Sequence, residues 1–206
     1  MPKRHYVSTV RAAAAAEKRD RVIQAATTLL REHNSIAAFS LDAVAKAAGV
    51  TRLTGYNQFG SRRGLLEAVF DETARQGGLS RIEQAMAMPD PGMALERLVE
   101  TFCHFWSWDS AIGRLQQEMS VDPELARALI ERNERRRTTL AVVVARAAGP
   151  AASSHARQDA VDMIFALTSY PTFATLRSNR TTDATCTLIK SACSRALDPV
   201  LGRCRS

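Results

Sequence analysis

Residues 51–58 carry side chains that can exchange hydrogen bonds with a polar partner. None of them is acidic: Thr51, Arg52, Thr54, Tyr56, Asn57 and Gln58. Side chains of these types contact the base edges and phosphate oxygens of DNA. Arg62 and Arg63 follow in the first turn of another expected helix, where cations oppose the helix dipole unless a phosphate binds there. Segment 51–63 therefore predicts a surface that binds DNA.

The residues before this segment are expected to position it. Ser40 is a suitable N-cap with Asp42 in the first turn, and Gly49 can take the left-handed conformation that ends a helix. Thr51 can cap a second helix that runs to about residue 59. The helix that follows Ser40 has one apolar face, which is expected to pack against neighbouring helices: Leu41, Val44, Ala45 and Ala48. The pattern is that of a helix-turn-helix, whose second helix lies in the major groove. An ordinary pair of packed helices is the alternative.

The positive charge is concentrated around this motif. The net charge is +7, from 28 basic and 21 acidic residues. Residues 1–63 hold 11 Lys and Arg against 4 Asp and Glu, which leaves 17 of each kind in the other 143 residues. The chain therefore combines a basic segment with a neutral one, as expected for a nucleic-acid-binding module joined to a domain of another kind.

Residues 21–70 resemble the DNA-binding domain of TetR-family transcriptional regulators. The resemblance rests on Ser-Leu-Asp-Ala-Val-Ala-Lys-Ala-Ala-Gly-Val-Thr at 40–51, Tyr-x-x-Phe-x-Ser with a following basic residue at 56–62, and Leu-Leu-Glu-Ala-Val at 65–69. It implies that Ser40 and Arg62 hold phosphates. It implies that five further residues face DNA: Thr51, Arg52, Thr54, Tyr56 and Asn57.

The sequence departs from the family pattern in two places. Gly55 stands where an apolar residue is usual, and glycine inside a helix costs about 1 kcal/mol relative to alanine. The expected recognition helix is therefore less stable by itself than those of its relatives. Asn34 and Ser35 replace a glycine that usually follows the first helix, although asparagine also tolerates a left-handed C-cap.

The whole chain is expected to be all-α. A three-helix N-terminal helix-turn-helix domain precedes a larger helical domain, because apolar residues recur at helical spacing and no strand alternation appears. The predicted domains are a basic arm at 1–16, a DNA-binding domain at 17–63, and an effector-binding and dimerisation domain at 64–206. The arm either contacts DNA or is a frayed tail whose alanines help to start the first helix. Further helices are predicted near 17–34, 61–76, 80–88, 93–108, 111–119, 123–149, 153–176 and 182–197.

Aromatic and methionine side chains in the second domain have two interpretations. They form an ordinary core, or they line an apolar pocket for a small molecule. The candidate lining residues are Phe102, Phe105, Trp106, Met119, Met163 and Tyr170. The resemblance implies that a ligand in this pocket shifts the fourth helix and releases DNA. A packed core would instead favour a DNA-binding protein without a small-molecule effector.

The last two helices have small and apolar faces, which suit an interface with a second copy of the chain. We therefore expect a homodimer that binds double-stranded, palindromic DNA, most simply as a repressor. The charged run at 131–137 is interpreted as a solvated face with i,i+4 pairs, the alternative being a second DNA contact.

Other functions find less support in the sequence. Cys103 and His104 are a conceivable nucleophile and base, but adjacent helical residues point about 100° apart. The four cysteines lack the spacing of a zinc site, and no cofactor is expected. No apolar run reaches the length of about 18 residues that a membrane helix needs, and no signal peptide is recognised. We expect a cytoplasmic protein that is not an enzyme.

Overall fold

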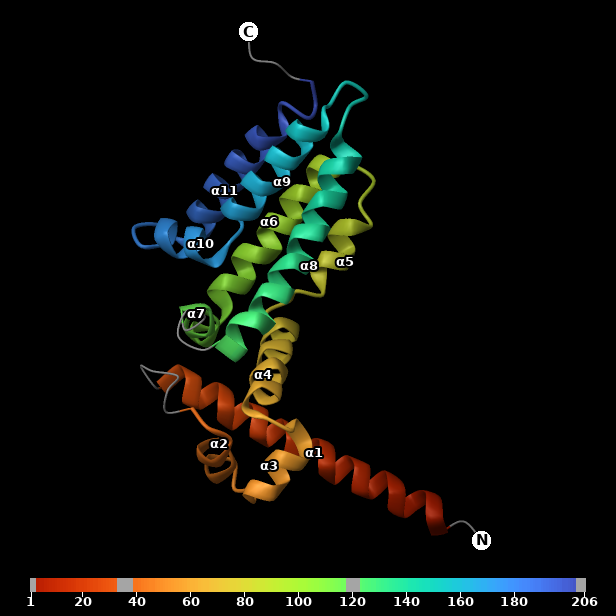
Figure 1. Cartoon of the computed structure of the whole chain (residues 1–206), viewed down its shortest axis with the longest axis vertical. Helices are drawn as coiled ribbons and strands as arrows, with labels where there is room; N and C mark the ends of the chain where they lie inside the picture. Colours follow the sequence, from red (N-terminus) through yellow and green to blue (C-terminus); the bar gives the residue numbers. More distant parts are fainter. Residues whose placement is uncertain (1–2, 33–38, 118–122, 203–206) are drawn as a thin grey trace. The chain divides into compact units, whose positions relative to one another are not determined.

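The computed structural model describes residues 3–32, 39–117 and 123–202, and these residues form eleven α-helices and no strand (Figure 1). The predicted all-α fold is confirmed. The helices are α1 (Lys3–Glu32), α2 (Leu41–Ala47), α3 (Arg52–Phe59), α4 (Arg62–Gln76), α5 (Arg81–Met86), α6 (Pro91–Trp108), α7 (Ser110–Gln117), α8 (Pro123–Ala147), α9 (Ser154–Leu167), α10 (Tyr170–Arg177) and α11 (Thr182–Leu197). None of the described helices is both long and apolar enough to cross a membrane.

The chain divides into two compact units whose boundary differs from the expected one after residue 63. The first unit contains residues 1–73 and 110–128, and the second contains residues 74–109 and 129–206. Helix α7 joins the first unit because it packs against α1. Arg114 Nη1 donates to the Leu30 carbonyl oxygen at 3.2 Å, at the C-terminal end of α1. The apolar face of α7 is buried through Ala111, Ile112 and Leu115.

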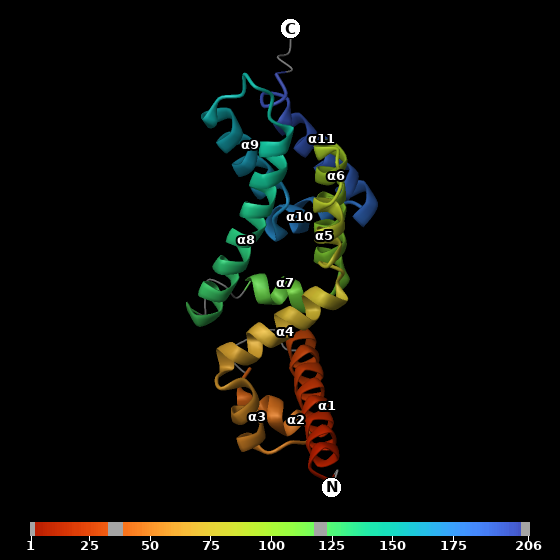
Figure 2. The same ribbon diagram turned by 90° about the vertical axis from the view of Figure 1, so that its right-hand side faces the viewer.

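In the first unit, α2 packs against both α1 and α3 (Figure 2). The expected helix ends are present. Ser40 Oγ accepts from the Ala43 N–H at 3.1 Å, and Gly49 has a φ of +64°. Side chains from four helices form the buried core: Val22, Ile23, Ala26, Leu30, Leu41, Val44, Ala45, Phe59, Leu65, Leu66, Val69 and Phe70.

The first helix begins earlier than the sequence pattern predicts. Helix α1 starts at Lys3 rather than near residue 17, so residues 3–16 of the expected arm are helical. The run of alanines at 12–16 explains the difference, because alanine has the highest helix propensity. Asn34 and Ser35, the second departure from the family pattern, lie outside the described residues.

In the second unit, α6 and α9 both pack against α11, and α5 packs against α6 (Figure 1). Asp90 caps α6 by accepting from the Met93 N–H at 2.7 Å. Ser80 and Glu83 have the spacing that predicts a capping box before α5, but this prediction is wrong, because Ser80 has helical dihedral angles and makes no side-chain cap bond. The core of this unit includes Leu95, Leu98, Val99, Phe102, Phe105, Leu140, Val143, Ile164, Ile189 and Cys193.

The predicted segment 153–176 is two helices rather than one. Helix α9 ends at Leu167, and α10 begins at Tyr170 after a cap at Ser169, whose Oγ accepts from the Thr172 N–H at 3.4 Å. Pro171 lies in the first turn of α10, where its missing N–H leaves no helical hydrogen bond unmade. A proline within a helical pattern is expected to kink or end the helix, and here α9 ends before it.

Candidate nucleic-acid interface

Helix α3 begins at a hydroxyl cap. Thr51 is extended, and its Oγ1 accepts from the Thr54 N–H at 3.2 Å. The two threonine hydroxyls are also 2.9 Å apart, within hydrogen-bonding distance. These contacts fix the first turn, so that the side chains that follow leave the helix in defined directions.

The outward face of α3 is polar apart from one residue. Four of the predicted DNA-facing residues are exposed, namely Thr51, Arg52, Tyr56 and Asn57, and Thr54 is half-buried. Leu53 is 69% exposed and is not one of the residues predicted to face DNA. Because apolar side chains contact the thymine methyl group in the major groove, this leucine adds an apolar element to the candidate surface.

Arg52 is oriented by neighbours on two helices. Its Nε lies 2.9 Å from Asp42 Oδ1 of α2, and its guanidinium carbon lies 5.3 Å from the centre of the Tyr56 ring. The hydrogen bond with Tyr56, and then the Asp42 carboxylate, raise the pKa of Arg52 above its ordinary value. The contacts direct this cation along the exposed side of α2 and α3.

The inward face of α3 explains the unusual glycine. Gly55 is buried, and a Cβ at this position would lie 3.8 Å from Leu41 Cδ2 and 3.9 Å from Ala45 Cβ. These are ordinary van der Waals distances, so an alanine fits. Gly55 is part of the regular helix and has no positive φ. The glycine is therefore compatible with the close packing of α2 and α3.

The early part of α1 also contacts α3. Gln58 Nε2 donates to the Ala15 carbonyl oxygen at 3.1 Å, and the Arg19 guanidinium lies 4.8 Å from the centre of the Phe59 ring. Residues 12–19 of α1 thus help to hold the C-terminal half of α3. The amphipathic pattern of the first helix did not reveal this contact, because it involves a backbone carbonyl and a cation.

Arg62 and Arg63 have partners inside the protein that the dipole argument did not anticipate. Arg62 Nε donates to the Phe39 carbonyl oxygen at 2.9 Å, which ties the start of α4 to the residue before Ser40. Arg63 Nε pairs with Glu67 Oε1 at 2.8 Å along the same helix. Arg62 therefore positions the start of α2, whatever phosphate contact it also makes.

Gly64, which is not one of the residues predicted to be important, fixes the junction between α3 and α4. A Cβ there would lie 2.1 Å from the Phe59 carbonyl oxygen, which is too close for any side chain. The end of α3 and the first turn of α4 can therefore approach this closely only at glycine. Ser61 Oγ completes the junction by accepting from the Gly64 N–H at 3.0 Å.

Of the five candidate effector-pocket residues that the structure describes, two line a common cavity and the other three do not line it. Phe102 and Phe105 are core residues, whereas Met163 is 55% exposed on α9. Met119 lies outside the described residues. Trp106 and Tyr170 do line a common cavity of about 360 Å³, together with Ser107, Phe173, Ala174, Arg177, Ser178 and Thr182. The Trp106 and Tyr170 rings meet edge to face with centres 5.7 Å apart.

Beside this cavity, a cluster of polar contacts surrounds the end of α9. The Thr168 carbonyl oxygen accepts from Trp106 Nε1 at 2.9 Å and from Arg136 Nη1 at 2.5 Å. The Arg136 guanidinium also lies 4.2 Å from the centre of the Phe165 ring. Its buried Nε has no hydrogen-bond acceptor among the described residues. Burial, and then the like charge of Arg137, lower the pKa of Arg136 to about 10.

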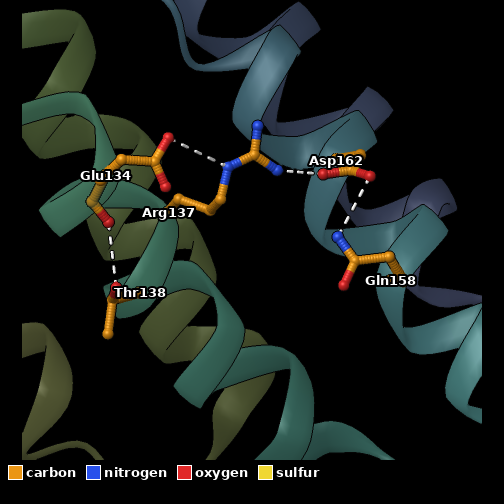
Figure 3. A network of polar contacts seen from close by, with 5 residues as sticks. All are labelled: Glu134, Arg137, Thr138, Gln158 and Asp162. Carbon is orange, nitrogen blue, oxygen red and sulfur yellow. Dashed lines mark hydrogen bonds and ion pairs between the residues drawn. The ribbon is translucent and has the colours of Figure 1, made fainter. Parts of the chain in front are cut away.

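The charged run at 131–137 is thus only partly the solvated face that its pattern indicated, because Arg136 points inward. Arg137 lies between Glu134 of its own helix, at 3.7 Å, and Asp162 of α9 (Figure 3). Gln158 Nε2 donates to the second oxygen of Asp162 at 3.2 Å. Hydrogen bonds from Gln158 and then Arg137 lower the pKa of Asp162. The run joins α8 to α9.

Comparison with known proteins agrees with this arrangement. Residues 22–69 match the family model of bacterial regulatory proteins of the tetR family, which covers the C-terminal part of α1, all of α2 and α3, and the N-terminal half of α4. No curated protein sequence matches the chain.

Solved structures share the fold over nearly the whole chain. A TetR-family transcriptional regulator from Rhodococcus sp. has a TM-score of 0.67 at 18% identity, covering 88% of this chain and 99% of its own. A transcriptional regulator from Saccharomonospora viridis, crystallised with choline, has a TM-score of 0.64 at 16% identity, covering 85% and 95%. A TetR transcription regulator from Haloarcula marismortui has a TM-score of 0.63 at 15% identity, covering 90% and 98%. The chain therefore contains, at residues 22–69, a match to the DNA-binding domain of bacterial regulatory proteins of the tetR family, and it shares the fold of solved TetR-family regulators over most of its length.

Proposed function

We propose that this regulator binds a palindromic operator as a homodimer and represses transcription until a small ligand releases it. The observation that carries the proposal is the outward face of α3. That face presents exposed hydrogen-bonding side chains and no carboxylate, on a helix that α1, α2 and α4 hold in place. A helix held in this way can enter the major groove without first having to order its side chains.

The residue roles follow from exposure and position. Thr51, Arg52, Thr54, Tyr56 and Asn57 contact bases or the phosphates beside them. Ser40 and Arg62 contact phosphates on either side of the groove. Each already has an intramolecular bond, which fixes its direction, and a second bond to a phosphate oxygen adds to it. We also propose that the protein is cytoplasmic and binds its operator there.

The dimer interface is proposed on α9 and α11, which pack against each other. Met163 of α9 and Leu188 of α11 are exposed, at 55% and 40%. Small exposed residues accompany them, among them Ala166, Ala184 and Ser191. Two such helices from each protomer form a four-helix interface, and the two-fold symmetry of the dimer is matched by a palindromic operator.

The ligand site is proposed at the cavity of Trp106, Tyr170 and Phe173. Its rings suit a small ligand with an apolar or aromatic body, and Arg177 at the same cavity suits a polar group on it. The relative crystallised with choline binds a small molecule, which supports a ligand site but not its chemistry here. Helix α4 runs from the first unit into the second after Thr73 and is the proposed transmitter.

A DNA-binding dimer without a small-molecule effector is the second candidate. The observation that favours it is the complete burial of Phe102 and Phe105 in the core, where the first hypothesis expected a pocket wall. A catalytic role for Cys103 with His104 is not proposed, because the hydrogen-bond partner of the Cys103 thiol is Cys186.

Selection from a pool of random DNA duplexes tests the DNA-binding proposal. The full-length protein is incubated with the pool at two salt concentrations, and the bound duplexes are sequenced. A palindrome with half-sites one helical turn apart is expected. Binding that depends steeply on salt but enriches no sequence would overturn the proposed operator recognition.

The dimer and the ligand site are tested separately. Met163→Glu with Leu188→Glu is expected to convert a dimer into a monomer in sedimentation, with Met93→Glu, an exposed residue of α6, as the matched control. A library of apolar and aromatic compounds is then screened for release of the selected duplex. Release from the wild type and equally from Tyr170→Ala would show that this cavity is not the ligand site.

A further inference from the structure

Two thiols meet between α6 and α11, outside the proposed DNA, dimer and ligand sites. Cys103 of α6 is buried and Cys186 of α11 is half-buried, and both are free cysteines. Their side chains are hydrogen-bonded to each other. Helices α6 and α11 also form the most extensive helix pair of the second unit. The packing of the two helices therefore holds the two sulfur atoms together.

The thiol pair is accessible from a groove. Cys103 and Cys186 both line a cavity of about 370 Å³. Charged and titratable groups from three helices share it: Arg81 from α5, Arg97, Glu100 and His104 from α6, and Asp183 and Lys190 from α11. A small polar oxidant can thus reach Cys186 without unfolding of the helices.

The surroundings of the two thiols shift their pKa values in opposite directions. Cys103 acts as the hydrogen-bond donor, which raises its own pKa and is the largest cause lowering the pKa of Cys186. Lys190, one turn after Cys186, lowers the Cys186 pKa further, while burial, Glu100 and Asp183 oppose it. A thiolate is the nucleophilic form of cysteine, so Cys186 is the more reactive partner.

We propose that Cys103 and Cys186 form an oxidation site that reacts with a small peroxide to give a disulfide between α6 and α11. This inference goes beyond the proposed function. Cys186 is the attacking thiol, because it lies at the groove with Lys190. Cys103 is the resolving thiol, because it is hydrogen-bonded to Cys186.

The reaction takes two steps. The Cys186 thiolate attacks one peroxide oxygen, the O–O bond breaks, and the leaving hydroxide is protonated to water, which gives a sulfenic acid. The Cys103 sulfur then attacks the Cys186 sulfur, the S–O bond breaks, and the Cys103 proton leaves with the hydroxide as a second water. Hydrogen peroxide is reduced to two waters by two electrons, and two thiols become one disulfide.

A third cysteine provides an internal control. Cys193 is buried with no exposed surface, and burial raises its pKa to about 12. It lies on the same helix as Cys186 but does not line the groove. It is therefore expected to stay reduced under conditions that oxidise the proposed pair.

Peptide mapping tests the proposal directly. Reduced full-length protein is treated with hydrogen peroxide, blocked with N-ethylmaleimide, digested with trypsin and analysed by mass spectrometry. Trypsin cleavage places the four cysteines in four different peptides, with Cys103 in 98–114 and Cys186 in 181–190. The expected product is a disulfide-linked pair of these two peptides. Cys193, in peptide 191–195, stays alkylated.

Variants test the assigned roles. Cys103→Ser is expected to abolish the linked peptide and to leave Cys186 as a sulfenic acid that dimedone traps. Cys186→Ser is expected to leave Cys103 alkylated. Lys190→Met is expected to slow formation of the disulfide several-fold, and Glu100→Gln to accelerate it. Thermal unfolding followed by circular dichroism checks that each variant is folded.

Three results would overturn the proposal, and the first needs only the wild-type protein. One is a linked peptide containing Cys193 in place of Cys103 or Cys186. Another is oxidation of Cys186 to sulfinic acid while Cys103 remains alkylated. The third is disulfide formation at the same rate in the wild type and in both charge variants.

Discussion

The outward face of α3 and the cluster around the Thr168 carbonyl use similar side chains in opposite ways. On α3, Arg52 is largely exposed, and its partners are exposed residues on the same surface. In the cluster, Arg136 is packed on Phe165 and donates to a buried carbonyl oxygen. Both arginines have aromatic neighbours and hydrogen bonds. Only their burial differs.

That difference separates two roles of polar residues. A polar group at the surface is satisfied by water, so its bonds within the protein contribute little to stability and it can bind another molecule. A buried polar group must be satisfied by the protein, so that removing its partner costs the desolvation free energy. Polar residues on α3 are therefore available for DNA, whereas those around Thr168 stabilise the fold.

The largest expected effect comes from Arg136→Ala. It should lower the free energy of unfolding by about 3 kcal/mol, because a charge-assisted bond and contacts with aromatic rings are lost. Urea unfolding measures the loss, and Arg52→Ala is the control, with an unchanged unfolding midpoint and weaker DNA binding. Equal losses of stability in the two variants would remove the distinction between the two regions.

Gly64→Ala tests whether stability and DNA binding depend on the close contact between the C-terminal end of α3 and the first turn of α4. The added methyl group meets the Phe59 carbonyl oxygen, so we expect the free energy of unfolding to fall by about 2 kcal/mol, as in other overpacked sites. Urea unfolding and operator affinity are both measured, and both should decrease. An unchanged stability would mean that α3 and α4 can separate at no cost.

Asn57→Ala should affect binding and not stability. Loss of a base contact should weaken binding to the selected operator by about 2 kcal/mol while binding to random DNA stays the same. Fluorescence anisotropy with the two duplexes measures this difference. If affinity for both duplexes falls equally, Asn57 contacts the DNA backbone, or does not contact DNA directly.

Arg62→Ala should affect both stability and DNA binding, because Arg62 is expected to serve both. Loss of the bond to the Phe39 carbonyl should lower the free energy of unfolding by about 1 kcal/mol. Loss of a phosphate contact should weaken binding to all sequences and reduce the salt slope by about one unit. Reduced stability with an unchanged salt slope would assign Arg62 to the fold alone.

The smallest effect is expected for Gly55→Ala. The alanine fits against Leu41 and Ala45 and should raise the free energy of unfolding by up to about 1 kcal/mol, because it restricts the unfolded chain. Thermal unfolding measures the gain. A loss of stability would show that α2 and α3 pack more closely than these distances indicate.

Sequence patterns predicted the local features of the DNA-binding unit correctly. The caps at Ser40 and Thr51 and the left-handed Gly49 depend on residues within four positions of each other, and all three are present. The spacing of Ser80 and Glu83 also predicts a cap, but Ser80 is itself helical and makes no side-chain cap bond. Leu53 is exposed on a face of α3 that was expected to be polar, because residue type alone does not show whether a side chain is exposed.

The sequence alone determined the helical fold class, the helix-turn-helix motif with its caps, and the concentration of positive charge, because these follow from short-range spacing and composition. The tertiary structure alone decided which residues pair across long separations. It placed α7 in the first unit and brought the Arg136 guanidinium to the Thr168 carbonyl oxygen. It also left no room for a side chain at Gly64 beside Phe59, and it brought the Cys103 thiol next to the Cys186 thiol. Such contacts depend on how helices pack, and no local pattern records that geometry.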